Sequence, residues 1–279
     1  MAWMKTLLIS GYGDIARRAA PRLEARYAVQ PLSRRHGFDL DRPETLVALQ
    51  GADAVLHCAP PPNTGTQDAR TRHLLAALAK GRILPARVVY VSTSGVYGDC
   101  GGAHVDESRA VCPQTDRARR RVDAEHQLAL WCSVRGVALV ILRVPGIYAA
   151  DRLPTERLRA GAPVLRAQDD VYTNHVHAED LAAILVRALE DAAPAGTYNA
   201  SDDSEIRMGD WFDLVAERAG LPRPPRIARA QAAGRISPEL LSFMSESRRL
   251  ANRRMKENLR VRLRYPTVFE GVPRCMGTA

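Results

Sequence analysis

The stretch Leu7-Leu8-Ile9-Ser10-Gly11-Tyr12-Gly13-Asp14-Ile15-Ala16 decides the fold. A short apolar run, typical of a buried strand, leads into Gly-x-Gly-x-x-Ala and then into a helical pattern that continues to residue 26. Glycine permits a tight turn and lets the backbone approach a phosphate closely, while the small Ala16 lets helix and strand pack together. The start of the helix offers N–H groups and a positive dipole end to an anion. We therefore expect the pyrophosphate of a dinucleotide to be held by Gly11, Tyr12, Gly13, Asp14 and Ile15.

Apolar runs and helical patterns alternate along the next hundred residues. Strands are expected at 27–32, 54–58, 87–92 and 137–143, and helices at 43–49, 66–80 and 117–135, with Gly81 and Gly136 as helix stops. Continuous apolar strands that alternate with helices indicate a parallel sheet buried on both faces. The predicted fold is therefore α/β, with a doubly wound parallel sheet that binds ligands beyond the carboxyl ends of its strands.

The pattern is less regular beyond residue 150. It predicts strands at 173–177 and 197–200 and helices at 178–191, 208–219 and 238–258. We expect residues 1–150, continued by about 173–200, to form a dinucleotide-binding core. Residues 151–172 and 201–279 are expected to form a smaller lobe that is interleaved with this core.

Two arginines follow the second predicted strand, in Ser33-Arg34-Arg35. A site for NAD usually offers Asp or Glu at this point, to bind the ribose hydroxyls. Guanidinium groups instead suit the 2′-phosphate of NADP through charge-assisted, bidentate hydrogen bonds. The sequence favours NADP over NAD as cofactor, and a solvated loop is the alternative interpretation of these arginines.

Composition limits the class of protein. The 279 residues are 46% apolar, enough for one large α/β domain or a domain with a lobe. The five cysteines show no metal-ligand spacing, so no metal site is expected, and reduced thiols suit a cytoplasmic protein. The apolar runs are too short for a signal peptide or a membrane span, so no membrane association is expected.

The net charge of +9 is concentrated in one segment. Residues 223–264 hold twelve Arg or Lys and three Asp or Glu, which leaves 28 basic and 28 acidic residues elsewhere. This segment has three interpretations: a solvated helix face, a site for a phosphate-bearing small molecule, or a nucleic-acid surface. Stacking on single strands needs interleaved aromatic residues, which are scarce here, so no nucleic-acid partner is expected.

Four further segments carry a family resemblance. The run Val91-Ser92-Thr93-Ser94-Gly95-Val96-Tyr97-Gly98 resembles the strand-end segment of extended short-chain dehydrogenases/reductases, the NAD-dependent epimerase/dehydratase group. Residues 53–59, 143–148 and 175–182 resemble other segments of that family in the same order. The resemblance implies a Rossmann fold with a small C-terminal substrate lobe. It implies that the cofactor also contacts Asp39, Leu40, Cys58, Ala59, Pro60, Ser92, Thr93, Arg121, Val144 and Pro145.

The chain departs from this family at its catalytic pair. The family uses Tyr-x-x-x-Lys on the helix after the Ser/Thr strand, with both side chains on one helix face. With Glu125 as the register mark, the Lys position falls on Arg121 and the Tyr position on Arg117. Arginine does not lose its proton near neutral pH, so Arg117 cannot replace a catalytic phenol. Thr93 and Arg121 remain as candidate catalytic residues, and the candidate substrate-binding residues are Tyr97, Tyr148, His175 and Arg248.

Two functions remain open. The first is an NADP-dependent oxidoreductase, epimerase or dehydratase that acts on a small anionic substrate with a non-standard proton donor. The second is a non-catalytic NADP(H)-binding sensor or regulatory subunit, which the loss of the tyrosine favours. The resemblance also suggests a homodimer formed through the predicted helices 66–80 and 117–135.

Overall fold

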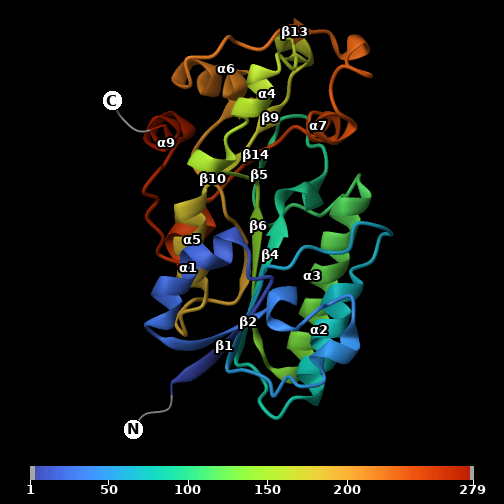
Figure 1. Ribbon diagram of the computed structural model, residues 1–279, viewed down its shortest axis with the longest axis vertical. Coiled ribbons are helices and arrows are strands. Elements are labelled where there is room, and N and C mark those ends of the chain that lie inside the picture. Colours follow the sequence, from blue (N-terminus) through green and yellow to red (C-terminus); the bar gives the residue numbers. More distant parts are fainter. Residues whose placement is uncertain (1–3, 277–279) are drawn as a thin grey trace.

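The computed structural model describes residues 4–276 and has a six-stranded sheet at its centre (Figure 1). Every neighbouring pair of strands in this sheet is parallel. This confirms the doubly wound parallel sheet that the sequence predicts. In sheet order the strands are β2 (Tyr27–Leu32), β1 (Lys5–Ser10), β3 (Ala54–His57), β4 (Arg87–Thr93), β6 (Ala138–Val144) and β11 (Gly196–Asn199).

Helices cover both faces of the sheet (Figure 1). On one face lie α1 (Asp14–Glu24) and α5 (Ala178–Ala188), and on the other lie α2 (Ala69–Lys80) and α3 (Asp116–Arg135). Side chains alternate between the faces, so Leu7 and Ile9 pack with the α1 and α5 cluster while Leu8 packs with the α2 and α3 cluster. The central parts of β1, β3, β4 and β6 are apolar because both of their sides are buried.

Capping residues set the helix boundaries. The Thr71 amide donates to the Asp68 carboxylate, so α2 begins at Ala69, three residues later than predicted. The Thr115 hydroxyl similarly accepts from the Ala118 amide at the start of α3, and Gly136, with a φ of +67°, ends that helix.

Above the sheet lies a second group of elements, drawn mainly from residues 151–172, 206–248 and 268–276, which we call the lobe (Figure 1). Its apolar cluster surrounds Trp211, Phe212 and Val215. The lobe contains the helices α4 (Thr155–Arg159), α6 (Met208–Arg218), α7 (Pro238–Phe243) and α9 (Val268–Cys275), and the strand pairs β8 (Val164–Leu165) with β13 (Arg226–Ile227) and β9 (Tyr172–Thr173) with β12 (Ile206–Arg207).

Short elements join the core to the lobe. Strand β7 (Gly146–Tyr148) pairs with β10 (His175–His177), and β5 (His104–Val105) pairs with β14 (Arg249–Leu250). Helix α8 (Arg253–Asn258) returns to the β11 edge, where Met255 packs with the core cluster. The remaining short helices are 3-10 helices: η1 (Arg34–His36), η2 (Pro43–Leu46), η3 (Ser94–Tyr97), η4 (Ala150–Arg152), η5 (Ala167–Asp169) and η6 (Arg229–Gln231).

The predicted helix 238–258 is wrong in its central part. The chain is helical in α7 and α8 but extended in β14 between them. The reason is tertiary: the amides of Arg249 and Ala251 donate to the carbonyls of Ala103 and Val105, which a helix would not allow. Helix propensity gives way here to pairing with β5.

The predicted strand 173–177 is two strands. Strand β9 pairs with β12 and β10 pairs with β7, so the two belong to different sheets. Between them, the Asn174 side chain donates to the Arg248 carbonyl and accepts from the Leu250 amide. These two hydrogen bonds hold the residue between β9 and β10 against the segment that leads into β14.

Asp202 lies buried after β11 with one carboxylate oxygen unpaired among residues 4–276. Burial raises the pKa of Asp202 from its usual 3.8 to about 7. The folded protein therefore keeps a proton that the unfolded chain releases as the pH rises above about 4. The contribution of Asp202 to the free energy of unfolding is therefore fully present below about pH 4, the pKa in the unfolded chain. This contribution is lost as the pH rises through about 7, the pKa in the folded protein.

We expect Asp202→Asn to raise the free energy of unfolding at about pH 8, by up to about 4 kcal/mol, and to change it little near pH 4. Urea denaturation across this pH range measures the difference. The control is Asp203→Asn, since Asp203 forms an ion pair with Lys256 at the surface. A stability difference for Asp202→Asn that is the same at both pH values would contradict the prediction.

Candidate functional site

A cavity of about 460 Å³ lies beyond the carboxyl ends of β1, β2 and β3, and we call it the nucleotide cavity. Each of the three strands ends in a loop that forms part of its wall. Ten of the predicted cofactor residues line it: Gly11, Tyr12, Gly13, Arg34, Arg35, Asp39, Leu40, Cys58, Ala59 and Pro60. The structure therefore brings together the glycine turn and the segments after the second and third strands.

Gly11 and Gly13 serve different purposes in the turn. Gly11 has a φ of +81°, and a Cβ there would lie 2.4 Å from the Ala59 amide nitrogen, so the fold itself requires glycine. Gly13 has a φ of −90°, and the nearest atom to a Cβ would be the Gly11 carbonyl oxygen, 4.0 Å away. The fold leaves room for a side chain at Gly13. Because glycine has no side chain, the start of α1 stays open to a ligand.

The donors that face the nucleotide cavity suit phosphate groups. The N-cap residue of helix α1 is Gly13, which has no side chain to accept from the first amides of the helix, so these amides are available to an anion. Arg34 and Arg35 are exposed, and their guanidinium groups have no hydrogen-bond partner in the described part of the chain. Arg17, one turn into α1, also lines the cavity. These features fit a dinucleotide that carries a 2′-phosphate.

Arg70 closes the far side of this cavity. Its guanidinium donates to both oxygens of Asp41, at 2.7 and 2.6 Å, and to the carbonyls of Pro60 and Pro61. The hydrogen bonds from Arg70 hold the pKa of Asp41 below its usual value. Arg70 therefore cross-links the loops after β2 and β3.

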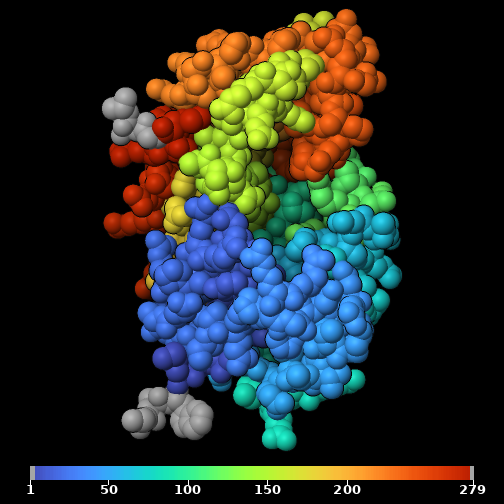
Figure 2. Space-filling view, viewed as in Figure 1, coloured from blue at the N-terminus to red at the C-terminus, as the bar shows by residue number. Residues whose placement is uncertain are grey.

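A second cavity, of about 580 Å³, adjoins the first at Pro60, and we call it the cleft. It lies between the core and the lobe, where Figure 2 shows a hollow below the yellow-green and orange atoms. Of the predicted residues, the cleft is lined by Thr93, Arg121, Pro145, Tyr148, His175 and Arg248. A ligand that extends past Pro60 would pass from the nucleotide cavity into the cleft.

Thr93 ends β4 and caps η3, where its hydroxyl oxygen accepts from the Gly95 amide at 3.2 Å. The hydroxyl proton remains available to a ligand in the cleft. Ser92 behaves differently, because its buried hydroxyl donates to Glu125 at 2.5 Å. Ser92 lies outside the lining of both cavities, so its predicted contact with the cofactor is not part of this geometry.

Tyr97 is also turned away from the cleft. Only 1% of it is exposed, and its hydroxyl donates to the Asn199 side chain at 2.8 Å. Arg143 stacks on its ring and forms a buried ion pair with Glu125 at 2.8 Å. One buried polar network thus lies beneath the cleft and contains Ser92, Glu125, Arg143, Tyr97 and Asn199. A buried ion pair is costly unless the remaining polar atoms of both partners are also hydrogen-bonded, and this network provides those bonds.

The two helix positions of the missing catalytic pair face the cleft. Arg121 donates to the Val91 carbonyl at 2.8 Å and to the Tyr90 hydroxyl at 3.1 Å, which ties α3 to β4. Arg117 instead lies over the Phe243 ring of α7, with its guanidinium carbon 4.1 Å from the ring centroid. Arg117 therefore connects the core to the lobe across the cleft.

Tyr148 and His175 form part of the cleft wall without offering a ready proton. The Tyr148 hydroxyl points toward α9, where it donates to the Thr267 carbonyl at 3.4 Å, and burial raises the pKa of Tyr148. His175 stacks on Trp211, with ring centroids 4.2 Å apart. Burial lowers the pKa of His175 to about 3, so its imidazole is neutral at physiological pH.

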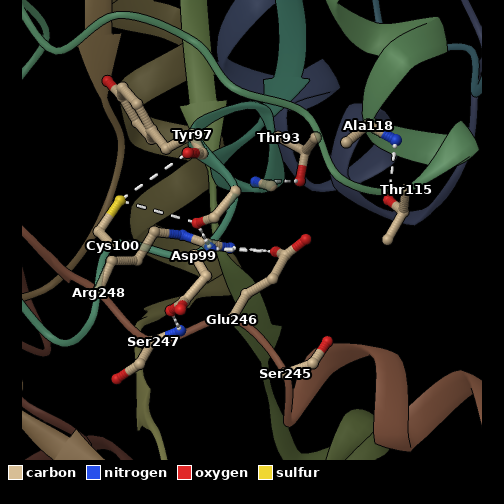
Figure 3. A network of polar contacts seen from close by, with 12 residues as sticks. Thr93, Tyr97, Asp99, Cys100, Thr115, Ala118, Ser245, Glu246, Ser247 and Arg248 are labelled. Atoms are coloured by element: carbon tan, nitrogen blue, oxygen red, sulfur yellow. Dashed lines mark hydrogen bonds and ion pairs between the residues drawn. The ribbon is translucent and has the colours of Figure 1, made fainter.

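Arg248 reaches the cleft from the lobe together with Glu246 (Figure 3). Its guanidinium donates twice to one Glu246 oxygen, at 3.0 Å each, and once to the Gly98 carbonyl at 2.7 Å. Both residues are buried. The other Glu246 oxygen, Oε1, has no hydrogen-bond partner within residues 4–276.

Asp14, Ile15 and Val144 lie beside the cavities but do not line them. Asp14 is paired with Arg18 and Arg152. Arg17, Arg70 and Glu246 line the two cavities but are not among the residues predicted from the sequence. Arg17 could have been predicted, because it follows Gly13 by four residues and so lies on the same helix face. Glu246 could not have been predicted from its neighbours in the sequence, because the residues around it in the cleft come from distant segments.

Much of the basic segment 223–264 is neutralised in the folded chain. Arg226, Arg249, Arg253 and Lys256 form ion pairs with Asp213, Glu205, Glu257 and Asp203, respectively.

Among the described residues, no cluster of His, Cys, Asp and Glu could hold a metal ion. None of the helices within residues 4–276 combines the length and the apolar character that a membrane span needs.

Comparison with solved structures finds the same fold in several proteins. A functionally unknown conserved protein from Silicibacter pomeroyi is 29% identical, with a TM-score of 0.76 and 98% of each chain covered. A human epimerase family protein solved with NADPH is 18% identical, with a TM-score of 0.78 over 98% of this chain and 100% of that one. The UDP-N-acetylglucosamine 4-epimerase from Bacillus cereus is 17% identical, with a TM-score of 0.72 and 98% of each chain covered.

No curated protein matches the sequence. A family model does match, that of the NAD dependent epimerase/dehydratase family, over residues 14–201. The match covers more than half of the chain and includes all of the core strands from β2 to β11. Together with the glycine turn and the cleft beside it, this match shows that the chain belongs to the NAD-dependent epimerase/dehydratase family.

Proposed function

We propose that this protein binds NADP(H), with the adenosine end in the nucleotide cavity and the nicotinamide end in the cleft. The observation that carries the proposal is Gly13, where the fold has room for a side chain but the sequence has none. Any side chain there would occupy the space that a pyrophosphate needs beside the start of α1. The family to which the chain belongs supports a nicotinamide dinucleotide in this cavity, either NAD or NADP.

The preference for NADP rests on the loop after β2. Arg34 and Arg35 present to the nucleotide cavity two guanidinium groups that have no partner within residues 4–276. A 2′-phosphate would bind them through charge-assisted hydrogen bonds. The nearby Asp41 is held by Arg70 and so offers little to a ribose 2′-hydroxyl.

We propose that the protein is an oxidoreductase, epimerase or dehydratase that acts on a small anionic molecule in the cleft. The cofactor, when bound, would accept or supply a hydride. Thr93 would donate a hydrogen bond to a substrate oxygen, and the neighbouring Arg121 would hold the cofactor ribose from α3. Holding cofactor and substrate in line contributes to rate without a phenol.

A second candidate function is a non-catalytic NADP(H) sensor or regulatory subunit. Arg117 favours it, because an arginine at the position of the family's tyrosine cannot exchange a proton near neutral pH. To separate the two functions, the protein and NADP⁺ can be incubated with fractionated metabolite extracts. Two readouts that are lost in Gly13→Val support an enzyme. Net formation of reduced nicotinamide reports an oxidoreductase, whereas an epimerase or dehydratase regenerates its cofactor and is detected by new product signals in NMR spectra of the fractions. Tight NADPH binding with neither change in any fraction supports a sensor.

Gly13→Val is expected to abolish NADPH binding while the protein remains folded. The valine Cβ meets no protein atom closer than 4.0 Å but projects into the cofactor's path. Fluorescence titration with NADPH and thermal unfolding provide the two measurements. Gly11→Val is the contrast, because its Cβ would overlap the Ala59 backbone and so unfold the protein. NADPH binding by Gly13→Val at the affinity of the unmodified protein would refute the proposed site.

The double substitution Arg34→Asp with Arg35→Ala is expected to weaken NADPH binding about a hundredfold and NADH binding only slightly. The reason is that only NADPH carries the 2′-phosphate. Isothermal titration with each cofactor measures the two affinities. The control, Arg22→Asp with Arg82→Ala, makes the same change in charge outside the cavity lining. Equal losses of NADPH and NADH affinity in the test variant would refute the assignment.

We further propose a homodimer formed through α2 and α3. Leu130 and Val134 lie one turn apart on α3 and are 70% and 72% exposed, which is unusual for adjacent apolar side chains of a monomer. Leu130→Glu with Val134→Glu is expected to shift a dimer to monomer in sedimentation velocity. Leu84→Glu, on a loop, is the control. A monomeric unmodified protein at micromolar concentration would rule the dimer out.

A further inference from the structure

Within the described part of the chain, the cleft contains one arginine whose guanidinium has no polar partner. Arg120 donates to the Gly65 carbonyl, Arg121 to the Val91 carbonyl, and Arg152 to Asp14, so these arginines of the cleft wall have protein acceptors. Arg117 forms no hydrogen bond or ion pair with any residue between 4 and 276. Its half-buried guanidinium rests on the Phe243 ring, which fixes its plane and leaves its N–H groups to the cleft.

The same cleft contains one buried carboxylate oxygen to which no described residue donates a hydrogen bond. Glu246 is 5% exposed, and its Oε2 is held by both terminal nitrogens of Arg248. Its Oε1 is buried and unpaired among the described residues. Figure 3 shows the Glu246 carboxyl group reaching from the lobe toward Thr93, with one oxygen on the Arg248 side and the other turned away from it. A buried acceptor left without a donor is costly, so a ligand donor there would restore the lost hydrogen bond.

Gly95 marks how near Glu246 lies to Thr93. A methyl group added at Gly95 would be 3.6 Å from the Thr93 Oγ1 and 3.9 Å from the Glu246 Oε2. The Thr93 hydroxyl of the core and the Glu246 carboxyl group of the lobe therefore flank the same point of the cleft. Glu246 also lies near Arg117. Among the carboxylates, Glu246 has the largest effect on the pKa of Arg117, which its negative charge raises.

We propose that Arg117 and Glu246 form a two-point recognition site for a small anion that carries a hydroxyl group. Arg117 binds the carboxylate or phosphate of this molecule, and the free oxygen of Glu246 accepts a hydrogen bond from its hydroxyl. The position where the family has a proton-transferring tyrosine thus serves in substrate selection. This inference deepens the proposed function, since it rests on the cleft being the substrate site.

The charges of the cleft favour a hydroxyl over an ammonium group as the ligand's donor. Glu246 is already neutralised by Arg248, and Arg117 adds a positive charge that is not balanced by a paired acid. An added ammonium would meet a net positive surface, whereas a hydroxyl carries no charge into it. The ligand class is therefore a hydroxy acid or a phosphorylated alcohol.

L-malate and succinate are suitable probes because they carry the same two carboxylates and differ by one hydroxyl. Isothermal titration is made into NADPH-saturated protein at low ionic strength, where exposed charges are least screened. We expect malate to bind about fivefold more tightly than succinate, because of the additional hydrogen bond to a charged acceptor. Chloride at high concentration should weaken both.

Three variants separate the two contacts. Arg117→Gln should weaken both acids about tenfold. Glu246→Gln should bring the malate-to-succinate affinity ratio to about one, because the charged acceptor of the malate hydroxyl is lost. It should not weaken succinate binding, because the substitution removes a negative charge from the cleft. Arg119→Gln is the matched control: it removes the same charge from the same helix, but at a surface position paired with Asp116, and should change neither affinity.

Four outcomes would overturn the inference: no binding of malate, equal binding of malate and succinate by the unmodified protein, equal losses in the Arg117 and Arg119 variants, or an unchanged ratio in Glu246→Gln. Thermal unfolding of each variant shows that it is folded. If Arg117→Gln is unstable, Phe243→Leu removes the ring that orients Arg117 and should also weaken both acids. NADPH titration of the same samples separates failure of this inference from failure of the cofactor site.

Discussion

The architecture depends on one contact between two backbones, that of Gly11 with Ala59. A Cβ at Gly11 would lie 2.4 Å from the Ala59 nitrogen, so only glycine lets the turn after β1 lie against the end of β3. This contact fixes where α1 begins and how it faces the loops after β2 and β3. The nucleotide cavity is the space left between these three strand ends, and it adjoins the cleft at Pro60.

Features specified by neighbouring residues could be predicted from the sequence. The glycine turn, the strands of the parallel sheet and the arginines after β2 all depend on local patterns, and the structure places them together. Ser92 and Tyr97 could not be placed in this way, because their direction depends on a buried network with Glu125, Arg143 and Asn199 from three other elements. The helix expected at 238–258 was wrong for a similar reason, since its central residues pair with β5.

Arg117, at the position that the sequence analysis assigns to the family's tyrosine, determines how the two parts of the molecule meet. A phenol in this position would serve a bound substrate from the core alone. The guanidinium spans the cleft and rests on Phe243 of α7, so a residue of the sheet side now contacts the lobe directly. A second set of contacts on the opposite face of the sheet, between Arg18 and the acids Asp14, Asp151 and Glu179, joins α1, η4 and α5. Core and lobe are thus connected by arginines on both sides of the sheet.

The return of α8 to the sheet has a consequence for how the chain acquires its structure during synthesis. Met255, Leu259 and Val261 complete the apolar cluster over β11, although the rest of that cluster comes from residues 7–200. A nascent chain that has emerged only to residue 240 would carry an assembled sheet with an uncovered apolar edge. The ribosome-bound intermediate would thus be open to chaperone binding or to aggregation until α8 and the residues that follow it have emerged.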